Sequence, residues 1–351
     1  MHTAGFTEVP VVDVAAMRGT PAERRALASH LEQICHHVGF FVAVNHGVDG
    51  AAIDDVFDLM QRFFALPTSD KELIDKRTSP HFRGWEAEGS EFTNNRPDFR
   101  EQIDVWSEWP AVSQAGATYD RLLGPNQWMP EDVLTGHRDI TLAWMDECGR
   151  LAQGLLSLLA IGLGLDEQHF DRFFGDQPMS LSKFIHYPPT PPGQAGVNAH
   201  HDAGFLTVLA PGPTPGLQVQ NPTGDWIDVP GVPGGLVINL GEMLQGMTGN
   251  YFVATAHRVI TADERFSAGY FHGPSLNATL DILPLASRYA DAVTRSPHHS
   301  ASGFMARREE THAGVDDMSS NHKPSVYGEQ LWNYFARSYP QNMADHHPEH
   351  A

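Results

Sequence analysis

The chain has 351 residues, enough to bury a substantial core in one large domain or in a domain with a helical annex. Its 23 Lys and Arg residues stand against 43 Asp and Glu residues, and the net charge of −20 disfavours nucleic acid and anionic membranes as partners. The longest apolar run, residues 155–165, is shorter than the about 20 residues that a membrane-spanning helix needs. No protein partner is evident, so the expected partner is a small molecule.

Cys35 and Cys148 are the two cysteines of the chain, too few for a disulfide framework. Both lie in apolar stretches with helical spacing, which predicts buried thiols. The first residues have neither the basic segment nor the apolar core of a signal peptide. We therefore expect a cytoplasmic protein.

The N-terminal part predicts two helices and a strand. Thr20 and Glu23 flank Pro21 as a capping box with Pro at the first helical position, and apolar residues follow at helical spacing. A strand is predicted at residues 40–44. A second amphipathic helix is predicted at about residues 51–65, with its apolar residues on one side.

Residues 75–130 show no clear period and are rich in Trp, Pro, Gly and charge. A long stretch of this kind in a compact domain is often functional. It contains Arg83, Trp85 and Glu91, which belong either to a substrate pocket or to a surface loop with a stacked Trp. We place an N-terminal region of helices, a strand and substrate loops at residues 1–130.

The following segment changes from helical to strand-like patterns. A long helix is predicted at residues 131–165, where apolar residues form a stripe, and a short one at about residues 167–174. From residue 181 onward, short strands alternate with Pro and Gly. The predicted strands cover residues 181–187, 204–210, 216–220, 226–229, 235–240, 251–260 and 267–272. Many short strands with turn signals between them are typical of a sandwich or jelly roll.

The last part predicts a loop-rich segment at residues 284–325 and a helix at about 327–337. A His-rich tail at residues 346–351 is expected to be disordered, with metal binding as the alternative. The predicted fold class is α+β with a mainly β core. It is a double-stranded β-helix, or jelly roll, flanked by helices and preceded by a helical N-terminal region. Residues 131–351 form the jelly-roll region.

His200 and Asp202 are separated by one residue, and His257 follows 57 residues after His200. Residues i and i+2 of a strand point to the same face, so a strand would direct the first pair toward one ion while His201 points away. Two imidazoles and one carboxylate leave one side of a metal open, as non-haem Fe(II) oxygenases require. The alternative is a polar strand end, because a chain with 20 His is expected to contain chance pairs.

A cation and a hydroxyl lie two residues apart at Arg265 and Ser267. A guanidinium can bind a carboxylate through two parallel hydrogen bonds, so the pair suits the distal carboxylate of a dicarboxylic acid. Arg265 by itself is compatible with an ordinary surface cation. The apolar and aromatic residues 268–271 follow directly, however, and they favour burial beside an anionic partner.

Further motifs are distributed along the chain. They are VPVVD at residues 9–13, GFFVAVNHGV at 39–48, YPP at 187–189, GEMLQGMTGN at 241–250, HRV at 257–259 and RFS at 265–267. In this combination the sequence resembles the isopenicillin N synthase-like branch of the Fe(II)/2-oxoglutarate-dependent dioxygenases over about residues 8–340. Within the branch, residues 265–272 and 327–340 resemble the bacterial ethylene-forming enzyme type.

The resemblance implies a ferrous ion held by the two histidines and the aspartate, with 2-oxoglutarate as cosubstrate and O2 as oxidant. The C5 carboxylate of 2-oxoglutarate is expected at Arg265, Ser267 and Tyr187, with Lys183 as a further cosubstrate residue. The implied reaction couples the decarboxylation of 2-oxoglutarate to succinate and CO2 with oxidation of a small-molecule substrate. Hydroxylation is the expected outcome, ahead of desaturation, ring closure or ethylene formation.

The chain departs from the family pattern at three positions. His201 stands where Thr is usual between the metal ligands, and Ile185 stands where plant members have Asn. Lys183 stands where the ethylene-forming type has Arg, and a Lys provides a point charge rather than a fork. Arginine binding and ethylene release are therefore not assumed for this chain.

Five residues are candidates for the substrate pocket: Arg83, Trp85, Glu91, Phe271 and Arg337. The last three match positions of interest in the ethylene-forming type, and Glu91 and Arg337 are candidates to meet a charged substrate group. The alternative is a salt bridge for each charged residue and core packing for Phe271. An amino acid, a nucleobase-like compound and a natural product are all compatible with these side chains.

Two other functions remain open. One is an iron-dependent oxidase of the same fold that does not use 2-oxoglutarate, and the other is a non-catalytic, cupin-like metal-binding protein. Tyr187, Arg265 and Ser267 favour the use of 2-oxoglutarate, although oxidases can retain the Arg and the Ser. The combination of a metal triad with an anion clamp argues against the non-catalytic function.

Overall fold

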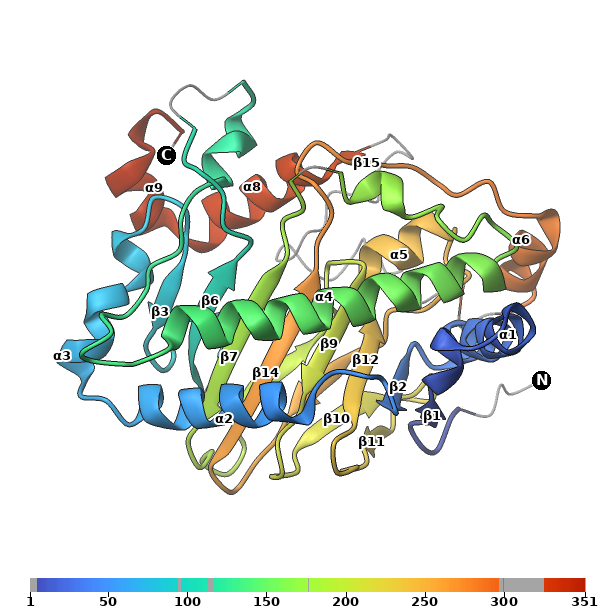
Figure 1. Cartoon of the computed structure of the whole chain (residues 1–351), viewed down its shortest axis with the longest axis horizontal. Helices are drawn as coiled ribbons and strands as arrows, with labels where there is room; N and C mark the ends of the chain where they lie inside the picture. The colour runs from blue at the N-terminus through green and yellow to red at the C-terminus, as the bar shows by residue number, and fades with distance from the viewer. Residues whose placement is uncertain are drawn as a thin grey trace.

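Two β-sheets form the centre of the molecule, and helices cover one face of the larger sheet (Figure 1). The structure is a computed structural model. It describes residues 5–93, 96–112, 116–175, 177–296, 299 and 325–350. The predicted fold class is confirmed, because the sheets form a jelly roll with a helical N-terminal region.

The larger sheet has eight strands and is antiparallel except between its first two. In spatial order they are β1 (Val11–Asp13), β2 (Phe40–Val44), β12 (Leu236–Leu240), β9 (Leu206–Ala210), β14 (Arg265–His272), β7 (Leu181–Tyr187), β6 (Glu101–Trp106) and β3 (Gly84–Glu86). Strands from before residue 130 therefore extend the jelly-roll sheet at both edges. The domain division at this residue stays a prediction.

The smaller sheet has four strands and carries both histidines of the predicted metal site. In spatial order they are β11 (Trp226–Asp228), β10 (Leu217–Gln220), β13 (His257–Val259) and β8 (Val197–His200). Two further pairs join β4 (Phe92–Thr93) to β5 (Arg96–Pro97) and β15 (Thr279–Leu280) to β16 (Ser325–Val326).

Helices flank the larger sheet. They are α1 (Pro21–His37), α2 (Gly50–Phe64), α3 (Thr68–Lys71), α4 (His137–Gly162), α5 (Glu242–Met247), α6 (Ser287–Thr294), α8 (Tyr327–Ser338) and α9 (Pro340–His346). Helix α4 runs across β7, β14, β9 and β12 with α2 beside it, whereas α8 and α9 lie near β3 and β6 (Figure 1). The predicted capping box is confirmed, since Thr20 and Glu23 exchange hydrogen bonds at the start of α1.

Strand alternation divides the side chains of the larger sheet between a cavity and the helices. On β14, Arg265, Ser267, Gly269 and Phe271 line a cavity between the sheets. The residues between them face the opposite way, so that Tyr270 reaches Gly149 of α4. This packing holds β14 flat against α4 and directs its polar side chains inward.

Residues 75–130 contain more regular structure than their sequence predicts. The segment Glu101–Trp106 forms β6, which pairs with both β7 and β3. Its apolar face is short, Ile103 and Val105, because the alternating positions Gln102 and Asp104 are polar, although both are buried. The prediction of an irregular segment was wrong here, because ion pairing rather than apolar packing stabilises one face of the strand.

Smaller differences affect the ends of elements. Helix α4 begins at His137 rather than near residue 131, and the short helix predicted at 167–174 is a single 3-10 turn at Asp171–Phe173. The predicted strand at 251–260 is reduced to the three residues of β13. The predicted C-terminal helix is confirmed as α8.

The His-rich tail is ordered as far as residue 350, so the expectation of disorder was wrong. The His346 and His347 imidazoles hydrogen bond to the backbone carbonyls of Arg77 and Pro80. These contacts hold the tail against the segment between α3 and β3. Most of the predicted loop-rich segment, residues 300–324, lies outside the described residues.

The cysteines and the helices can be compared with what the composition predicts. Cys35 and Cys148 are buried free thiols, as predicted. None of the helices within the described ranges combines the length and the apolar character that crossing a membrane would require.

Gly39 provides a test of the packing between β2 and the segment before β13. Its φ of 66° lies in the left-handed region, and a Cβ atom there would come within 2.0 Å of the Val253 carbonyl oxygen. We expect Gly39→Ala to lower the free energy of unfolding by about 1–3 kcal/mol, measured by urea denaturation. Gly50→Ala is the control, because nothing lies within 4 Å of that position. Equal stability of the two variants would contradict the expected strain.

Candidate metal and cosubstrate site

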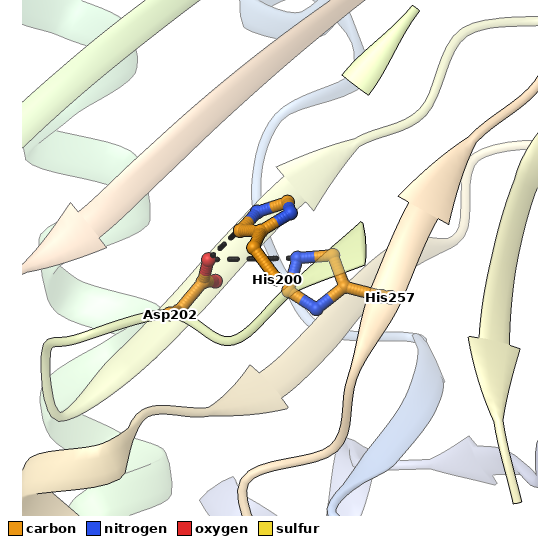
Figure 2. Close-up of side chains that lie close together, drawn as sticks. All are labelled: His200, Asp202 and His257. Carbon is orange, nitrogen blue, oxygen red and sulfur yellow. Dashed lines mark ion pairs between the residues drawn. The ribbon is translucent and has the colours of Figure 1, made fainter. Parts of the chain in front are cut away.

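Three side chains with metal-binding atoms meet between β8, β13 and the loop after β8 (Figure 2). His200 ends β8 and His257 begins β13, and the two residues are direct partners across the strand pair. Asp202 Oδ1 lies 3.5 Å from the Nε2 atom of each histidine. Among the described residues, no other group of three such side chains lies this close together.

The path of the chain at Asp202 differs from the prediction. Strand β8 ends at His200, so Asp202 lies in the loop that leads to β9 rather than on the same strand face. The loop turns its carboxylate back toward the strand end, where both imidazoles meet it (Figure 2). His201 lines the cavity but is not part of the cluster.

Backbone carbonyls orient both imidazoles in the same way. The Nδ1 atom of His200 lies 2.9 Å from the carbonyl oxygen of Asn198, and that of His257 lies 3.1 Å from the carbonyl oxygen of Thr255. A carbonyl can only accept, so in each ring Nδ1 carries the hydrogen and donates it. The lone pair then remains on Nε2, the atom that faces Asp202, which is the tautomer needed for metal binding.

The electrostatics of the cluster favour a positive charge at its centre. Burial raises the pKa of the Asp202 carboxyl, but the facing His257 and His200 imidazoles hold this pKa well below its ordinary value. Burial lowers the pKa of His257, but Asp202 raises it above its ordinary value. Both shifts show that a cation between these groups is stabilised, and a bound metal ion would provide that charge in place of a proton.

The donor set fits a ferrous ion. Ligands of one ion at about 2.1 Å lie roughly 3.0–3.4 Å from one another, close to the 3.5 Å separations of the carboxylate oxygen from the two nitrogens. Two histidines and one carboxylate leave the other side open, as in non-haem Fe(II) oxygenases. The cluster borders a cavity of about 750 Å³ on this open side.

The predicted anion clamp lies on two paired strands of the larger sheet. Arg265 of β14 is the direct partner of Tyr187 of β7, and its guanidinium carbon lies 4.9 Å from the centre of the Tyr187 ring. Ser267 Oγ donates to the Tyr187 hydroxyl at 3.3 Å. These three side chains therefore lie together in the same cavity as the metal cluster.

Arg265 is a buried cation that lacks an anionic partner within the described residues. Its side chain is 1% exposed, burial lowers the pKa of its guanidinium, and its Nε and Nη1 atoms have no hydrogen-bond acceptor there. A buried charge is costly unless it is paired. A dicarboxylate that binds the metal with one end and Arg265 with the other would provide the missing anion.

Comparisons with known proteins agree with this geometry. Residues 9–131 match the model of the non-haem dioxygenase in morphine synthesis N-terminal family, and residues 176–274 match that of the 2OG-Fe(II) oxygenase superfamily. A 2-oxoglutarate-dependent dioxygenase of Dothideomycetidae sp. (strain 11243) is 30% identical over 354 residues, which cover 98% of this chain and 91% of the relative. The chain belongs to the Fe(II)/2-oxoglutarate-dependent dioxygenases.

Other relatives show the breadth of this family. A 1-aminocyclopropane-1-carboxylate oxidase of Dictyostelium mucoroides is 26% identical over 82% of this chain and 88% of the relative. The solved structure of Neurospora crassa T7H with alpha-KG and thymine has a TM-score of 0.74, with 22% identity over 94% of this chain and 97% of that one. This likeness concerns the fold. The dioxygenase described here is of the isopenicillin N synthase-like type, with Fe(II), 2-oxoglutarate and O2 as its cofactor and cosubstrates.

A continuous series of ion-paired charges runs along one side of the dioxygenase cavity, and four of its members, Asp104, Lys183, Glu91 and Arg100, line the cavity. In order along the series the charges are Glu86, Lys76, Asp104, Lys183, Glu91, Arg100 and Asp98. Negative and positive groups alternate, and every adjacent pair forms an ion pair. Four carboxylates and three cations make up the series, so each cation lies between two carboxylates. Such buried pairs need good geometry on both sides, because the penalty for removing charges from water is large.

Lys183 belongs to this series rather than to the clamp. Its Nζ atom lies 3.2 Å from Glu91 and 3.0 Å from Asp104, and its strand partner on β14 is Gly269. That position is four residues, or about 13 Å, from Arg265 along the strand. Lys183 also lines the cavity, so its role toward the cosubstrate stays a prediction, although two carboxylates already hold its ammonium group.

The predicted substrate residues divide into two groups. Glu91, Phe271 and Arg337 line the cavity. Arg83 and Trp85 do not line it, and the predictions for these two are corrected. Arg83 is fully buried and donates to the His81 carbonyl, while the Trp85 indole donates to Glu101 Oε2 at 2.9 Å.

Several residues of the site were missed by the sequence analysis. Arg100 and Asp104 of the cavity wall were missed together with β6. Thr207 and Asn239 also line the cavity and hydrogen bond to Asp202. The available signal was Asn239 itself, which is a single polar residue within the apolar strand Leu236–Leu240.

The charge of Glu91 predicts a pH dependence of stability. Burial raises the pKa of this carboxyl, but Arg100 and Lys183 hold it below the ordinary value of 4.5. The ionised carboxylate therefore contributes stability that is complete above about pH 4.5 and is lost as the pH falls through the folded-state pKa. We expect Glu91→Gln to be less stable than the parent at neutral pH, with a difference that narrows below about pH 4.5.

Urea denaturation from about pH 7 to about pH 3.5 measures this difference. Asp55→Asn, on the exposed side of α2, is the control and should match the parent throughout. A Glu91→Gln deficit that stays constant with pH would mean that packing, rather than the carboxylate charge, stabilises this position.

Proposed function

We propose that His200, Asp202 and His257 are the ligands of Fe(II) in this dioxygenase. The observation that carries the proposal is the position of Asp202 Oδ1, which lies 3.5 Å from both Nε2 atoms at the border of the cavity. When bound, the iron and 2-oxoglutarate supply oxidising chemistry, in which decarboxylation to succinate and CO2 accompanies oxidation of the substrate. Hydroxylation of a small molecule is the proposed outcome.

The clamp residues have a positioning role in this proposal. Arg265, Ser267 and Tyr187 hold the C5 carboxylate of 2-oxoglutarate through hydrogen bonds, of which those from the guanidinium are charge-assisted. The apolar side chains of Ile185 and Val259 line the cavity as well and limit the access of water. Ile185 pairs with Ser267, so an apolar group occupies the position where plant members have Asn.

The remaining cavity provides room for a substrate beyond the cosubstrate. Glu91 and Phe271 are proposed substrate residues on the sheet side, and Arg337 of α8 is proposed on the opposite side. Glu91 already accepts from Arg100 and Lys183, so it presents a fixed carboxylate. The chemical class of the substrate stays open among small molecules.

We also propose a cytoplasmic location. It is supported by the two free, buried thiols of Cys35 and Cys148, which fit a reducing compartment.

Removal of a ligand tests the metal assignment. We expect Asp202→Ala and His257→Ala each to abolish iron-dependent release of succinate, because two remaining ligands do not hold the ion. Circular dichroism should show an unchanged fold, and metal analysis should show loss of bound iron. Thr141→Val, a buried change in α4, is the control and should retain iron. Stoichiometric iron in His257→Ala would contradict the assignment.

Arg265→Ala tests the clamp. The guanidinium makes charge-assisted hydrogen bonds worth about 1.5–3 kcal/mol, so the Kd for 2-oxoglutarate should rise about 10- to 150-fold. Anaerobic titration of the Fe(II) protein measures this Kd through the visible charge-transfer band. Arg62→Ala, an exposed change on α2, should leave the Kd unchanged.

The same titration separates the dioxygenase from the oxidase alternative. A saturable band in the parent protein establishes 2-oxoglutarate as a ligand of the bound iron. A parent protein that holds stoichiometric iron but gives no band would favour an oxidase that does not use 2-oxoglutarate. An unchanged Kd in Arg265→Ala, with a normal band, would show that the clamp lies elsewhere in the cavity.

A further inference from the structure

The two oxygen atoms of Asp202 have different surroundings. Oδ1 faces the two imidazoles, at 3.5 Å from each Nε2 atom. Oδ2 faces the larger sheet, where it accepts hydrogen bonds from Thr207 Oγ1 at 2.6 Å and from Asn239 Nδ2 at 2.7 Å. One oxygen is thus directed to the metal position, and the other is held by two neutral donors.

These donors are positioned by the larger sheet and not by the loop that carries Asp202. Thr207 of β9 and Asn239 of β12 are direct partners across an antiparallel strand pair, so their side chains emerge next to each other on the cavity face. Asp202 follows the last residue of β8 in the smaller sheet. Its carboxylate therefore bridges the two sheets at the metal position.

The cost of placing an amide on β12 indicates that its hydrogen bond matters. The other four residues of the strand, Leu236, Val237, Ile238 and Leu240, are apolar and buried, and Asn239 itself is 3% exposed. A buried amide without a partner is destabilising, whereas an apolar residue would pack here without that penalty. The Asn239 amide nitrogen meets this requirement by donating a hydrogen bond to Asp202 Oδ2.

We infer that Asn239 and Thr207 are positioning residues that restrict Asp202 to one metal-binding oxygen. The inference rests on the proposed function. Each carboxylate oxygen has about two lone-pair sites, and the two donors occupy those of Oδ2. Chelation through both oxygens would have to break at least one of these bonds. Binding through Oδ1 alone would leave more of the metal's coordination positions free for 2-oxoglutarate and O2.

The double variant Asn239→Leu, Thr207→Val tests this role, because it removes both donors with little change of volume. We expect it to keep stoichiometric Fe(II) but to bind 2-oxoglutarate at least about 10-fold more weakly, since the released Oδ2 competes for a cosubstrate position. Anaerobic titration gives the Kd, and metal analysis gives the iron content. Thr207→Ser keeps the hydroxyl donor and should bind 2-oxoglutarate like the parent. Thr141→Val is the control for a buried Thr-to-Val change elsewhere.

A second measurement keeps the inference testable if the double variant does not fold. A crystal structure of the parent protein with Fe(II) and 2-oxoglutarate should show Oδ1 bound to the metal and both hydrogen bonds to Oδ2 retained. Two metal-bound oxygens of Asp202 in that structure would overturn the inference, as would parent-like cosubstrate affinity in the folded double variant. A parent protein that binds neither iron nor 2-oxoglutarate would instead contradict the proposed function.

Discussion

A charge removed from water must meet an opposite charge, a metal ion or a ligand, and this constraint explains the polar residues around the cavity. In the series from Glu86 to Asp98, four carboxylates and three cations alternate, so that every charge has an opposite neighbour. Asp202 and its two imidazoles favour a cation between them. Arg265 has unfilled donor atoms and no carboxylate partner within the described residues. The cavity thus combines a series of mutually paired charges with two places that need a partner from outside the chain.

Much of this arrangement could be predicted from residue types and spacing. The His200 and Asp202 pair, the pair at Arg265 and Ser267, and the short strands around them all suffice to propose a metal site beside an anion site. The register of β14 and β7 brings two of the predicted clamp residues together, since Arg265 pairs with Tyr187. Spacing along the chain could not reveal that Asp202 reaches the cluster from a loop, because a turn of backbone leaves no periodic signal.

The errors share a physical cause. Strand recognition relies on an apolar face, and β6 has only Ile103 and Val105 on that face. Its buried Asp104 is instead paired with Lys76 and Lys183, which are far away in the sequence. For the same reason the sequence analysis missed Asn239, whose amide donates a hydrogen bond to Asp202. Arg83 and Trp85 show the reverse error, since a charge and an aromatic ring in an irregular stretch resemble pocket residues although both are used internally. Tertiary partners, and not local patterns, decide which polar side chains reach the cavity.

The charged series and helix α8 border the same cavity, but they differ in how many residues must change together when one of them is substituted. A substitution that removes the charge of Asp104 or Lys183 deletes two ion pairs of the series at once, so neighbouring positions would have to change with it. Helix α8 contributes the uncharged Leu331, Tyr334 and Phe335 to the same cavity, together with Arg337, which is not a member of the charged series. Single substitutions at the uncharged positions alter the shape of the cavity and leave every ion pair of the series in place. Substrate preference can therefore change most readily through the uncharged residues of α8, while the charged series stays the same.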